Sequence, residues 1–225
     1  MKYAITADIH ANLPALTAVM QDIEQQGCDR IVCAGDVVGY GSQPKECVKV
    51  VREKFFACVR GNHDEYVGSD AYLGRFNETA AQAVRRTREQ LGDDDRRWLS
   101  DLPLVLELDG FTLVHGSLEA PQRWEYVLDN YAAASSLSHQ TTPLCFLGHT
   151  HVPIAFIRDT GVRGGTYSTF RVEPGKKYFV NVGSVGQPRD HNPDAAYVIC
   201  DLKRQTVELR RIPFDRKVAT GTASD

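Results

Sequence analysis

The 225 residues are 42% hydrophobic, 24% charged and 9% aromatic, with a formal net charge of -3 and a pI near 6.2. This composition is typical of one globular domain rather than a disordered or membrane-bound chain, and it provides no basic field for bulk binding of nucleic acid. The N-terminus lacks a secretory signal pattern, and the six cysteines include no C-x-x-C pair. We therefore expect a cytoplasmic protein with reduced thiols that makes no membrane contact.

The first part of the chain predicts alternating strands and helices. Strands are expected at residues 2–7, 30–34 and 56–59, and helices at residues 12–26 and 44–55. Asn12 is a suitable cap for the first helix, and Gly27 ends it. The resulting β-α-β-α-β order predicts parallel strands with crossover helices, and in such sheets ligands bind beyond the carboxyl ends of the strands.

The next region, residues 65–102, predicts a helical insertion in which Asn77 caps one helix and Asp93 begins another. Short strands then follow at residues 104–108, 111–114, 144–147, 154–157, 166–172, 178–182, 196–201 and 207–211. So many short strands fit two packed sheets more easily than one. We expect a single domain over residues 1–213 and a polar C-terminal tail over residues 214–225.

Five of the predicted strands end in residues that commonly bind metals. The clusters are Asp8-Ile9-His10, Gly35-Asp36, Gly61-Asn62-His63-Asp64, His115-Gly116 and Gly148-His149-Thr150-His151. A single histidine at such a place is usually structural, but imidazoles with carboxylates and an amide oxygen form a donor set that suits manganese, iron, zinc, cobalt or nickel. The donors are numerous enough for two ions, and Asp36 is the natural bridge because its two oxygens could each bind one cation.

The order of these motifs resembles the calcineurin-like metallophosphoesterase family, in particular its small bacterial members. The family motifs D-x-H, G-D, G-N-H-[DE], a lone histidine and G-H-x-H occur here in that order between Asp8 and His151. The resemblance implies an α/β fold in which helices flank a two-sheet β-sandwich. It also implies that one divalent transition-metal ion is held by Asp8, His10, Asp36 and His151, and a second by Asp36, Asn62, His115 and His149.

The implied activity is hydrolysis of phosphoric esters of small phosphorylated substrates. Two metal ions about 3.5 to 4 Å apart would lower the pKa of a shared water, and the bridging hydroxide would attack phosphorus in line with the leaving group. His63 follows Asn62 directly, so in an extended turn its side chain should point away from the metals and be free to donate a proton. The resemblance gives His63 the same role toward the leaving group, and the alternative is that it only orients Asn62 or Asp64.

Arg60 and Arg189 are candidates for binding the substrate phosphate, because a guanidinium matches phosphate oxygens in a bidentate fork. Asn62 would also contact the substrate. Arg60 could instead form a structural ion pair beneath its turn. Arg189 lies in the glycine-rich segment 183–190, which resembles a motif of small bacterial members of the family.

The second motif departs from that of related protein phosphatases and dinucleotide tetraphosphatases. Tyr40 stands where those enzymes have an arginine, and Gly39 stands where the protein phosphatases have an aspartate that partners the histidine corresponding to His63. His63 therefore needs another partner, for which Asp64 is a candidate. Because a dianionic monoester would lack one expected cation, we expect a phosphodiester or another small substrate to be preferred over a phosphoprotein.

Other functions are compatible with parts of the pattern. Within the family these are a dinucleotide polyphosphatase or a protein phosphatase. A noncatalytic scaffold that binds partner proteins on the same fold would lack motif residues, whereas all of them are present here. A metal-dependent amide hydrolase would more naturally open with H-x-H and form an eight-stranded barrel.

Overall fold

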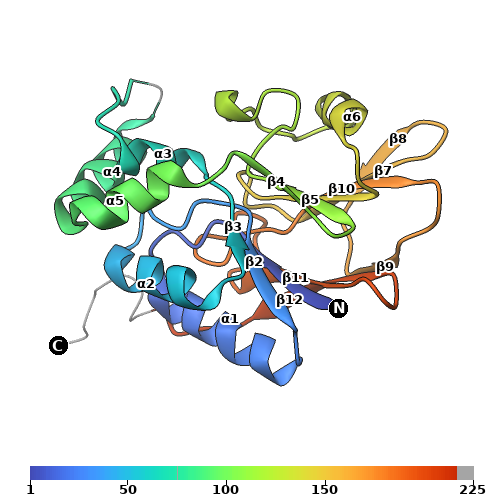
Figure 1. The fold of residues 1–225 in the computed structure, drawn as a ribbon, viewed down its shortest axis with the longest axis horizontal. Coiled ribbons are helices and arrows are strands. Elements are labelled where there is room, and N and C mark those ends of the chain that lie inside the picture. Colours follow the sequence, from blue (N-terminus) through green and yellow to red (C-terminus); the bar gives the residue numbers. More distant parts are fainter. Residues whose placement is uncertain (75, 217–225) are drawn as a thin grey trace.

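The computed structural model describes residues 1–74 and 76–216, which fold into two β-sheets with helices on their outer faces (Figure 1). The strands are β1 (Lys2–Thr6), β2 (Arg30–Cys33), β3 (Ala57–Cys58), β4 (Val105–Leu108), β5 (Phe111–Val114), β6 (Leu144–Leu147), β7 (Ile154–Arg158), β8 (Val162–Gly165), β9 (Thr169–Arg171), β10 (Lys177–Asn181), β11 (Ala195–Asp201) and β12 (Thr206–Ile212). The helices are α1 (Leu13–Gln25), α2 (Pro44–Lys54), α3 (Asn62–Gly68), α4 (Glu78–Gln90), α5 (Asp93–Asp101) and α6 (Asn130–His139), with the short 3₁₀ turn η1 (Pro121–Arg123).

Each sheet has six strands and mixes parallel with antiparallel pairs. The first sheet has the order β3-β2-β1-β11-β12-β9, and the second has the order β4-β5-β6-β10-β7-β8. Strands β1, β2 and β3 run parallel, as do β5, β6 and β10. The fold is therefore the predicted α/β sandwich, and it contains no eight-stranded barrel within the described residues.

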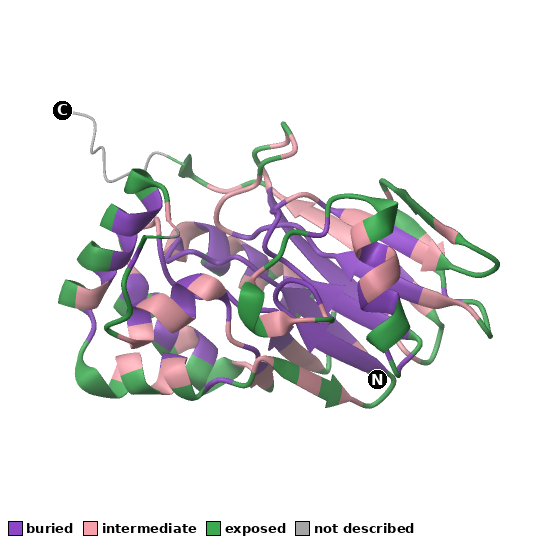
Figure 2. Ribbon diagram, turned by 90° about the horizontal axis from the view of Figure 1, so that it is seen from above, coloured by how far each residue is buried: buried purple, intermediate pink, exposed green. Residues whose placement is uncertain are grey.

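The central strands are buried on both faces because each sheet packs against its partner on one side and against helices on the other (Figure 2). In β1, Tyr3 and Ile5 point into the core between the sheets, whereas Ala4 joins the cluster beneath α1 and α2. In β10, Val180 belongs to the core between the sheets, and Phe179 packs beneath α6. This alternation is the two-residue period of a strand, and it produces three hydrophobic layers.

The predicted caps occur in the structure, and residues 65–102 are largely helical. The side chain of Asn12 accepts a hydrogen bond from Ala15 N at 3.2 Å, and that of Asn77 accepts one from Ala80 N at 2.9 Å. Helices α3, α4 and α5 form one group beside the first sheet, to the left in Figure 1. This group corresponds to the expected helical insertion, and its first helix begins directly after β3.

Some elements differ from the sequence prediction. The turn after β3 was expected to be extended, but α3 begins at Asn62 itself. Helix α6 and strand β8 were not predicted, and the strand expected over residues 166–172 is the shorter β9. The missed helix carries few large apolar residues, and β8 is an exposed edge strand that contains two glycines, so neither has a strong hydrophobic period.

The end of the described chain packs against the first sheet's helical layer. Ile212 and Phe214 contact the cluster formed with α1 and α2, so Phe214 is not part of a free tail. Residues 217–225 of the expected polar tail lie outside the described residues. Within residues 1–74 and 76–216, every helix is too short or too polar to span a lipid bilayer.

Candidate metal centre and active site

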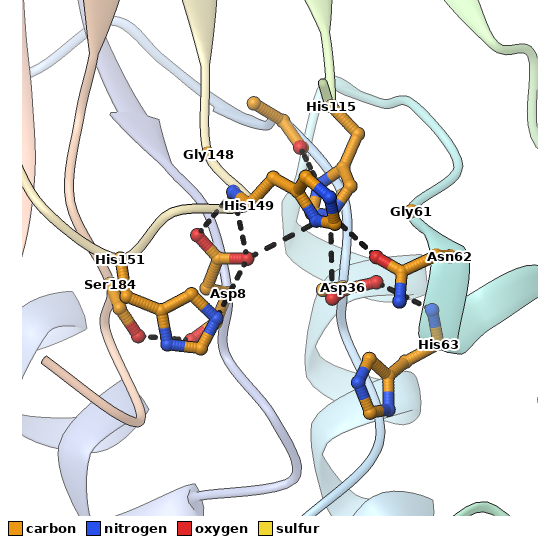
Figure 3. A network of polar contacts seen from close by, with 12 residues as sticks. Asp8, Asp36, Gly61, Asn62, His63, His115, Gly148, His149, His151 and Ser184 are labelled. Carbon is orange, nitrogen blue, oxygen red and sulfur yellow. Dashed lines mark hydrogen bonds and ion pairs between the residues drawn. The ribbon is translucent and has the colours of Figure 1, made fainter. Parts of the chain in front are cut away.

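The predicted ligand residues meet where five strands end, across the junction of the two sheets (Figure 3). Asp8, Asp36 and Asn62 follow β1, β2 and β3 of the first sheet, whereas His115 and the pair His149 and His151 follow β5 and β6 of the second. Asp8 links the two sheets, because its carboxylate accepts the backbone N–H of His149 at 2.9 and 3.2 Å. The carboxyl ends of strands from both sheets therefore form one site, as parallel strand order predicts.

The backbone at this edge is unusually strained. Five residues of the predicted ligand set have a left-handed backbone, with φ between 50° and 71°: Asp8, His10, Asp36, His149 and His151. Non-glycine residues pay roughly 1 to 3 kcal/mol each for such conformations, which persist where the surrounding structure enforces them, often at functional sites. Here the reversed backbone turns the side chains of the strand-ending residues toward one another.

The first predicted ligand set is compact. Nε2 of His10 lies 3.0 Å from Nε2 of His151, 3.9 Å from Oδ1 of Asp8 and 3.7 Å from Oδ2 of Asp36. Nε2 of His151 lies 3.6 Å from the same Oδ1 of Asp8. All four side chains are buried, so these atoms converge in a space that bulk water does not enter freely.

The second predicted ligand set is less complete in the structure. Nε2 of His115 lies 3.3 Å from Oδ2 of Asp36 and 3.2 Å from Oδ1 of Asn62. The ring of His149 lies beside that of His115, with ring centroids 4.9 Å apart. Nε2 of His149 faces the carbonyl of Trp124 at 2.8 Å, so its Nδ1 is the nitrogen left for a ligand.

All four histidines of the two sets place one ring nitrogen on a backbone carbonyl. His10 Nδ1 faces Val38 O at 3.0 Å, His115 Nδ1 faces Ala34 O at 2.8 Å, His149 Nε2 faces Trp124 O at 2.8 Å, and His151 Nδ1 faces Gln187 O at 2.7 Å. A carbonyl only accepts, so each of these nitrogens carries a proton, and in the neutral ring the other nitrogen has a lone pair. This arrangement is the usual second layer of support around a metal-binding imidazole.

The donor set fits cations for a further reason. With their Nδ1 protons on carbonyls, neutral His10 and His151 present two lone pairs to each other across 3.0 Å. Two lone pairs at that distance repel each other, and a cation that both nitrogens coordinate removes the repulsion. The donors are nitrogens and oxygens without sulfur, a combination that suits borderline transition metals.

The acidic residues are buried together, and their pKa values reflect it. Burial raises the pKa of Asp8 to about 8. Burial alone would also raise the pKa of Asp36, but positive charge at His115 holds it well below its usual range. Burial alone would lower the pKa of His115, and the neighbouring Asp36 raises it to about 10. The cluster therefore compensates a buried carboxylate with positive charge, which is also what bound cations do.

His63 differs from the expectation in its surroundings. Its ring lies 4.9 Å from the ring of His10 and 4.7 Å from that of Tyr40, and one of its nitrogens lies within 4.8 Å of ligand atoms of His10 and Asp36. His63 is therefore beside the first ligand set rather than directed away from it. Its Nδ1 is buried without a hydrogen-bond partner and faces Gly39, whereas Nε2 is the nitrogen available to a substrate.

Asp64 is not the partner of His63. Its carboxylate accepts four backbone N–H groups, from Gly61 at 3.0 Å, Asp36 at 2.8 Å, Val37 at 2.9 Å and Val38 at 3.2 Å. These bonds cap α3 and fasten it to the loop after β2. The expectation that Asp64 replaces the missing aspartate at position 39 is therefore wrong, because both oxygens of Asp64 are engaged elsewhere.

The two arginines lie in different environments. Arg60 Nε is 3.4 Å from Oε2 of Glu65, and its Nη1 donates to the carbonyl of Ser100 at 2.5 Å, which favours the structural ion pair over contact with substrate. Arg189 lies at the rim of the site, where its Nη2 donates to Oε1 of Gln187 at 2.7 Å and lies 3.5 Å from the hydroxyl of Tyr40.

Several supporting residues carry no signal in the sequence. Trp124 acts through its carbonyl on His149, and Tyr126 stacks on the same imidazole at 4.1 Å with an interplanar angle of 10°. Ser184 donates to the carbonyl of Asp8 at 2.8 Å, and Asn181 donates to Thr150 at 2.9 Å in the loop between the last two histidines. Among these residues, only Asn181 and Ser184 lie at or just after the end of an apolar strand, which is the one sequence signal that could have indicated a supporting role at the site.

A cavity of about 300 Å³ opens directly beside the ligand residues. Asn62, His63 and His149 form its inner wall, and Ala80 of α4 contributes to its outer wall. Asn77, Arg123 and five aromatic residues line the remainder, and we call it the aromatic cavity; the aromatic residues are Tyr40, Tyr66, Phe76, Trp124 and Tyr126. A ligand that occupies it is held against the predicted metal ligands and the helical insertion.

Comparison with known proteins agrees with this architecture. Residues 1–205 match the calcineurin-like phosphoesterase superfamily domain. A metallophosphoesterase structure from Sphaerobacter thermophilus superposes with a TM-score of 0.86 at 37% identity, over 97% of this chain and 91% of that one. An uncharacterised protein of Methanocaldococcus jannaschii is 36% identical over 223 residues, which cover 96% of this chain and 89% of that protein. Phosphodiesterase YfcE of Escherichia coli is 27% identical over 212 residues, which cover 89% and 88% of the two chains.

Proposed function

Because this chain belongs to the calcineurin-like phosphoesterase superfamily and is a metal-dependent phosphoric ester hydrolase, we propose that it uses two divalent transition-metal ions to cleave phosphodiesters. The first ion would be held by Asp8, His10, Asp36 and His151, and the second by Asp36, Asn62, His115 and His149. Manganese, iron, zinc, cobalt and nickel all suit these donors.

The position of Asp36 carries this proposal. Its Oδ2 lies 3.7 Å from Nε2 of His10 in the first set and 3.3 Å from Nε2 of His115 in the second. Its Oδ1 accepts the backbone N–H of His63 at 2.8 Å and is thereby engaged. One oxygen therefore faces both ligand sets, so Asp36 is the residue that could serve two cations.

The residues divide the chemistry between them. Bound cations lower the pKa of water and neutralise charge on the phosphoryl group. The amide of Asn62 lies at the wall of the aromatic cavity, where it would orient the phosphate, and Nε2 of His63 would hold the proton that the leaving oxygen receives. The buried cluster around Asp36 fixes these groups before the substrate arrives.

The preference for a diester is supported by what surrounds the phosphate position. Tyr40 occupies the place of an arginine in related protein phosphatases, and Arg60 is engaged by Glu65 and the carbonyl of Ser100. Arg189 is then the proposed phosphate-binding cation, beside the hydroxyl of Tyr40. Loss of one charge-assisted hydrogen bond costs about 1.5 to 3 kcal/mol, and a dianionic monoester suffers more from it than a monoanionic diester. The name of the Escherichia coli relative, a phosphodiesterase, agrees with this preference.

A metal titration and a substrate panel test the proposal. We expect elemental analysis of metal-replete protein to give close to two transition-metal ions per chain, and bis-p-nitrophenyl phosphate to be cleaved at least as fast as p-nitrophenyl phosphate. A phosphoserine peptide with a kcat/KM far above that of the diester would overturn the substrate preference. A single bound ion would overturn the bridged centre, and no turnover with any of the five metals would favour a binding scaffold instead.

We also propose that residues 1–213 form one metallophosphoesterase domain and that the protein acts in the cytoplasm. The first part agrees with the match to the family over residues 1–205. The second part is supported by the cysteines, since all six are free thiols and five of them are buried. Fractionation of cells that express the natural chain would test the location.

A further inference from the structure

The aromatic cavity is too unusual in its lining to be explained as part of the core. Core rings such as Phe111, Phe146 and Phe179 are less than 2% exposed. The five rings of the aromatic cavity are half-buried, apart from that of Tyr126, which is 53% exposed. Aromatic residues that remain accessible around a concave surface are characteristic of ligand sites.

The backbone directs two of these rings into the cavity at some cost. Tyr40 has a φ of 48° and Trp124 a φ of 58°, both in the left-handed region that non-glycine residues rarely adopt. Tyr40 lies in the loop after β2, and Trp124 lies directly after η1. Two separate loops that line one cavity therefore each contain a residue with a left-handed backbone. Such strain is usually retained where it has a functional role.

The cavity also contains polar groups that could recognise a planar ligand. Asn77 uses its Oδ1 to cap α4, which leaves its amide nitrogen as a donor at the cavity wall. Arg123 lines the same cavity with a side chain that is 69% exposed, and its ion pair with Glu125 is long, at 3.8 Å. A few polar groups within an aromatic lining are the usual composition of a small-molecule site.

A second, larger cavity of about 570 Å³ lies on the other side of Tyr40. It touches His10 among the predicted ligands, whereas the aromatic cavity touches Asn62, His63 and His149. Of the five rings, the larger cavity includes that of Tyr40 alone. A group joined to a phosphate at the metal centre is therefore better placed in the aromatic cavity.

We propose that the aromatic cavity binds the base of a nucleotide-type phosphate ester while the phosphate lies at the candidate metal centre. The position of the phosphate rests on the proposed function, but stacking of the base on the aromatic rings does not require turnover. Stacking of a base on an aromatic side chain contributes about 1 to 3 kcal/mol, which corresponds to roughly 5- to 150-fold in affinity. Arg123 and Asn77 would contact the edge of the base or the sugar.

Calorimetric titration with three phosphate esters tests this inference. Metal-replete protein is titrated in the presence of Mn²⁺ with adenosine 5′-monophosphate, ribose 5-phosphate and phenyl phosphate, and chromatography verifies that each remains intact. We expect adenosine 5′-monophosphate to bind at least about 5-fold more tightly than ribose 5-phosphate, since they differ only in the base. Equal affinities would overturn the inference, and so would tighter binding of phenyl phosphate than of the nucleotide.

Two variants locate the binding to the cavity. Tyr66→Ala and Tyr126→Ala should each reduce the affinity ratio of the nucleotide to ribose 5-phosphate by about 5-fold or more. Tyr131→Ala is the matched control, because Tyr131 is 89% exposed on α6 and does not line the aromatic cavity. An unchanged ratio in both cavity variants would overturn the location. Base-dependent binding by a metal-replete protein that cleaves neither bis-p-nitrophenyl phosphate nor p-nitrophenyl phosphate would refute the proposed function and leave the cavity assignment standing.

Discussion

The interior of the sandwich and the edge where its strands end differ in both side-chain polarity and backbone conformation. Between the sheets, apolar side chains such as Ile5, Phe146 and Val198 alternate along regular extended strands. At the edge, buried carboxylates and imidazoles stand on left-handed backbone a few residues beyond those strands. Burial of apolar area stabilises the fold, whereas burial of unpaired charge and strained backbone destabilises it.

This difference indicates that the interior serves stability, whereas the edge serves the proposed metal binding and activity. The interior supplies the free energy that holds the ligand edge in place, and the edge depends on compensating charge that its own residues provide incompletely. Changes at the edge should therefore alter activity and metal binding more than folding. Changes in the interior should do the reverse, and the four predictions below test this division.

The largest expected effect is that of Asp36→Asn on activity. The substitution removes the charge that faces both ligand sets, so we expect kcat/KM to fall by about 10⁴-fold or more, which exceeds the loss at any single histidine ligand. Measured kinetics and metal content decide this. Asp93→Asn on the first turn of α5 is the control, and it should leave both unchanged. If Asp36→Asn retained two ions and most of its activity, the bridging role would be refuted.

His63→Gln should have a smaller effect that depends on the leaving group. Since an alkoxide needs a proton and p-nitrophenolate does not, we expect a loss of roughly 10²- to 10⁴-fold on an alkyl ester and a much smaller loss on a p-nitrophenyl ester. Rate measurements on both substrates with confirmed metal content provide the test. Equal losses on the two esters, or loss of metal, would show that His63 supports the site structurally.

Added metal should raise the free energy of unfolding of an interior variant but not that of a variant at the ligand edge. At a free metal concentration 100-fold above Kd, one bound ion raises the free energy of unfolding by about 2.7 kcal/mol, or roughly 5 to 10 °C in Tm. We expect this rise in the natural protein and in Leu113→Ala, although the interior variant starts about 2 to 5 kcal/mol less stable. Asp36→Asn should lose most of the rise. An equal rise in all three proteins would contradict the division between the regions.

The smallest effect concerns a charged group outside the ligand edge. Asp22 of α1 accepts bonds from Tyr197 at 2.6 Å and from Arg210 at 2.9 Å. Burial alone would raise the pKa of Asp22, but these two partners hold it below its usual range. The stability that Asp22 adds, about 1 kcal/mol, should be present above its unfolded pKa near 3.9 and be lost as pH falls through the lower folded pKa. Denaturation of Asp22→Asn at pH 7 and near pH 2 measures it, and a pH-independent difference would contradict the assignment.

The sequence predicted the first part of the fold well because its signals are local. Helix α1 has a capping Asn12 and a regular apolar period, and β1 and β2 are continuous apolar runs that end in polar clusters. Those clusters predicted that the candidate ligand residues converge, because strand direction decides where such residues meet. Helix α6 was missed because its buried side chains are Ala133, Ser136 and Leu137, of which only one is large.

The surroundings of the site were less predictable because they depend on backbone atoms and on distant contacts. Trp124 supports His149 through a carbonyl, which any residue at that position would possess. The pairing of Asp64 with four backbone amides required the loop after β2 and the start of α3 to be placed relative to each other. The five rings of the aromatic cavity likewise come from three segments whose separation in the sequence hides their common role.

The four bonds of Asp64 also bear on how members of this fold could diverge. They connect the first turn of α3 to the loop that contains Asp36. The candidate ligand Asp36 is therefore held in place by residues that precede α4 and α5 in the sequence. Everything from Tyr66 to the end of α5 lies beyond these residues, including Phe76 and Ala80 of the cavity wall. Mutations there can reshape the pocket while the ligand geometry is held by another segment. We therefore expect substitutions in this helical segment to change the aromatic cavity more than the candidate metal centre.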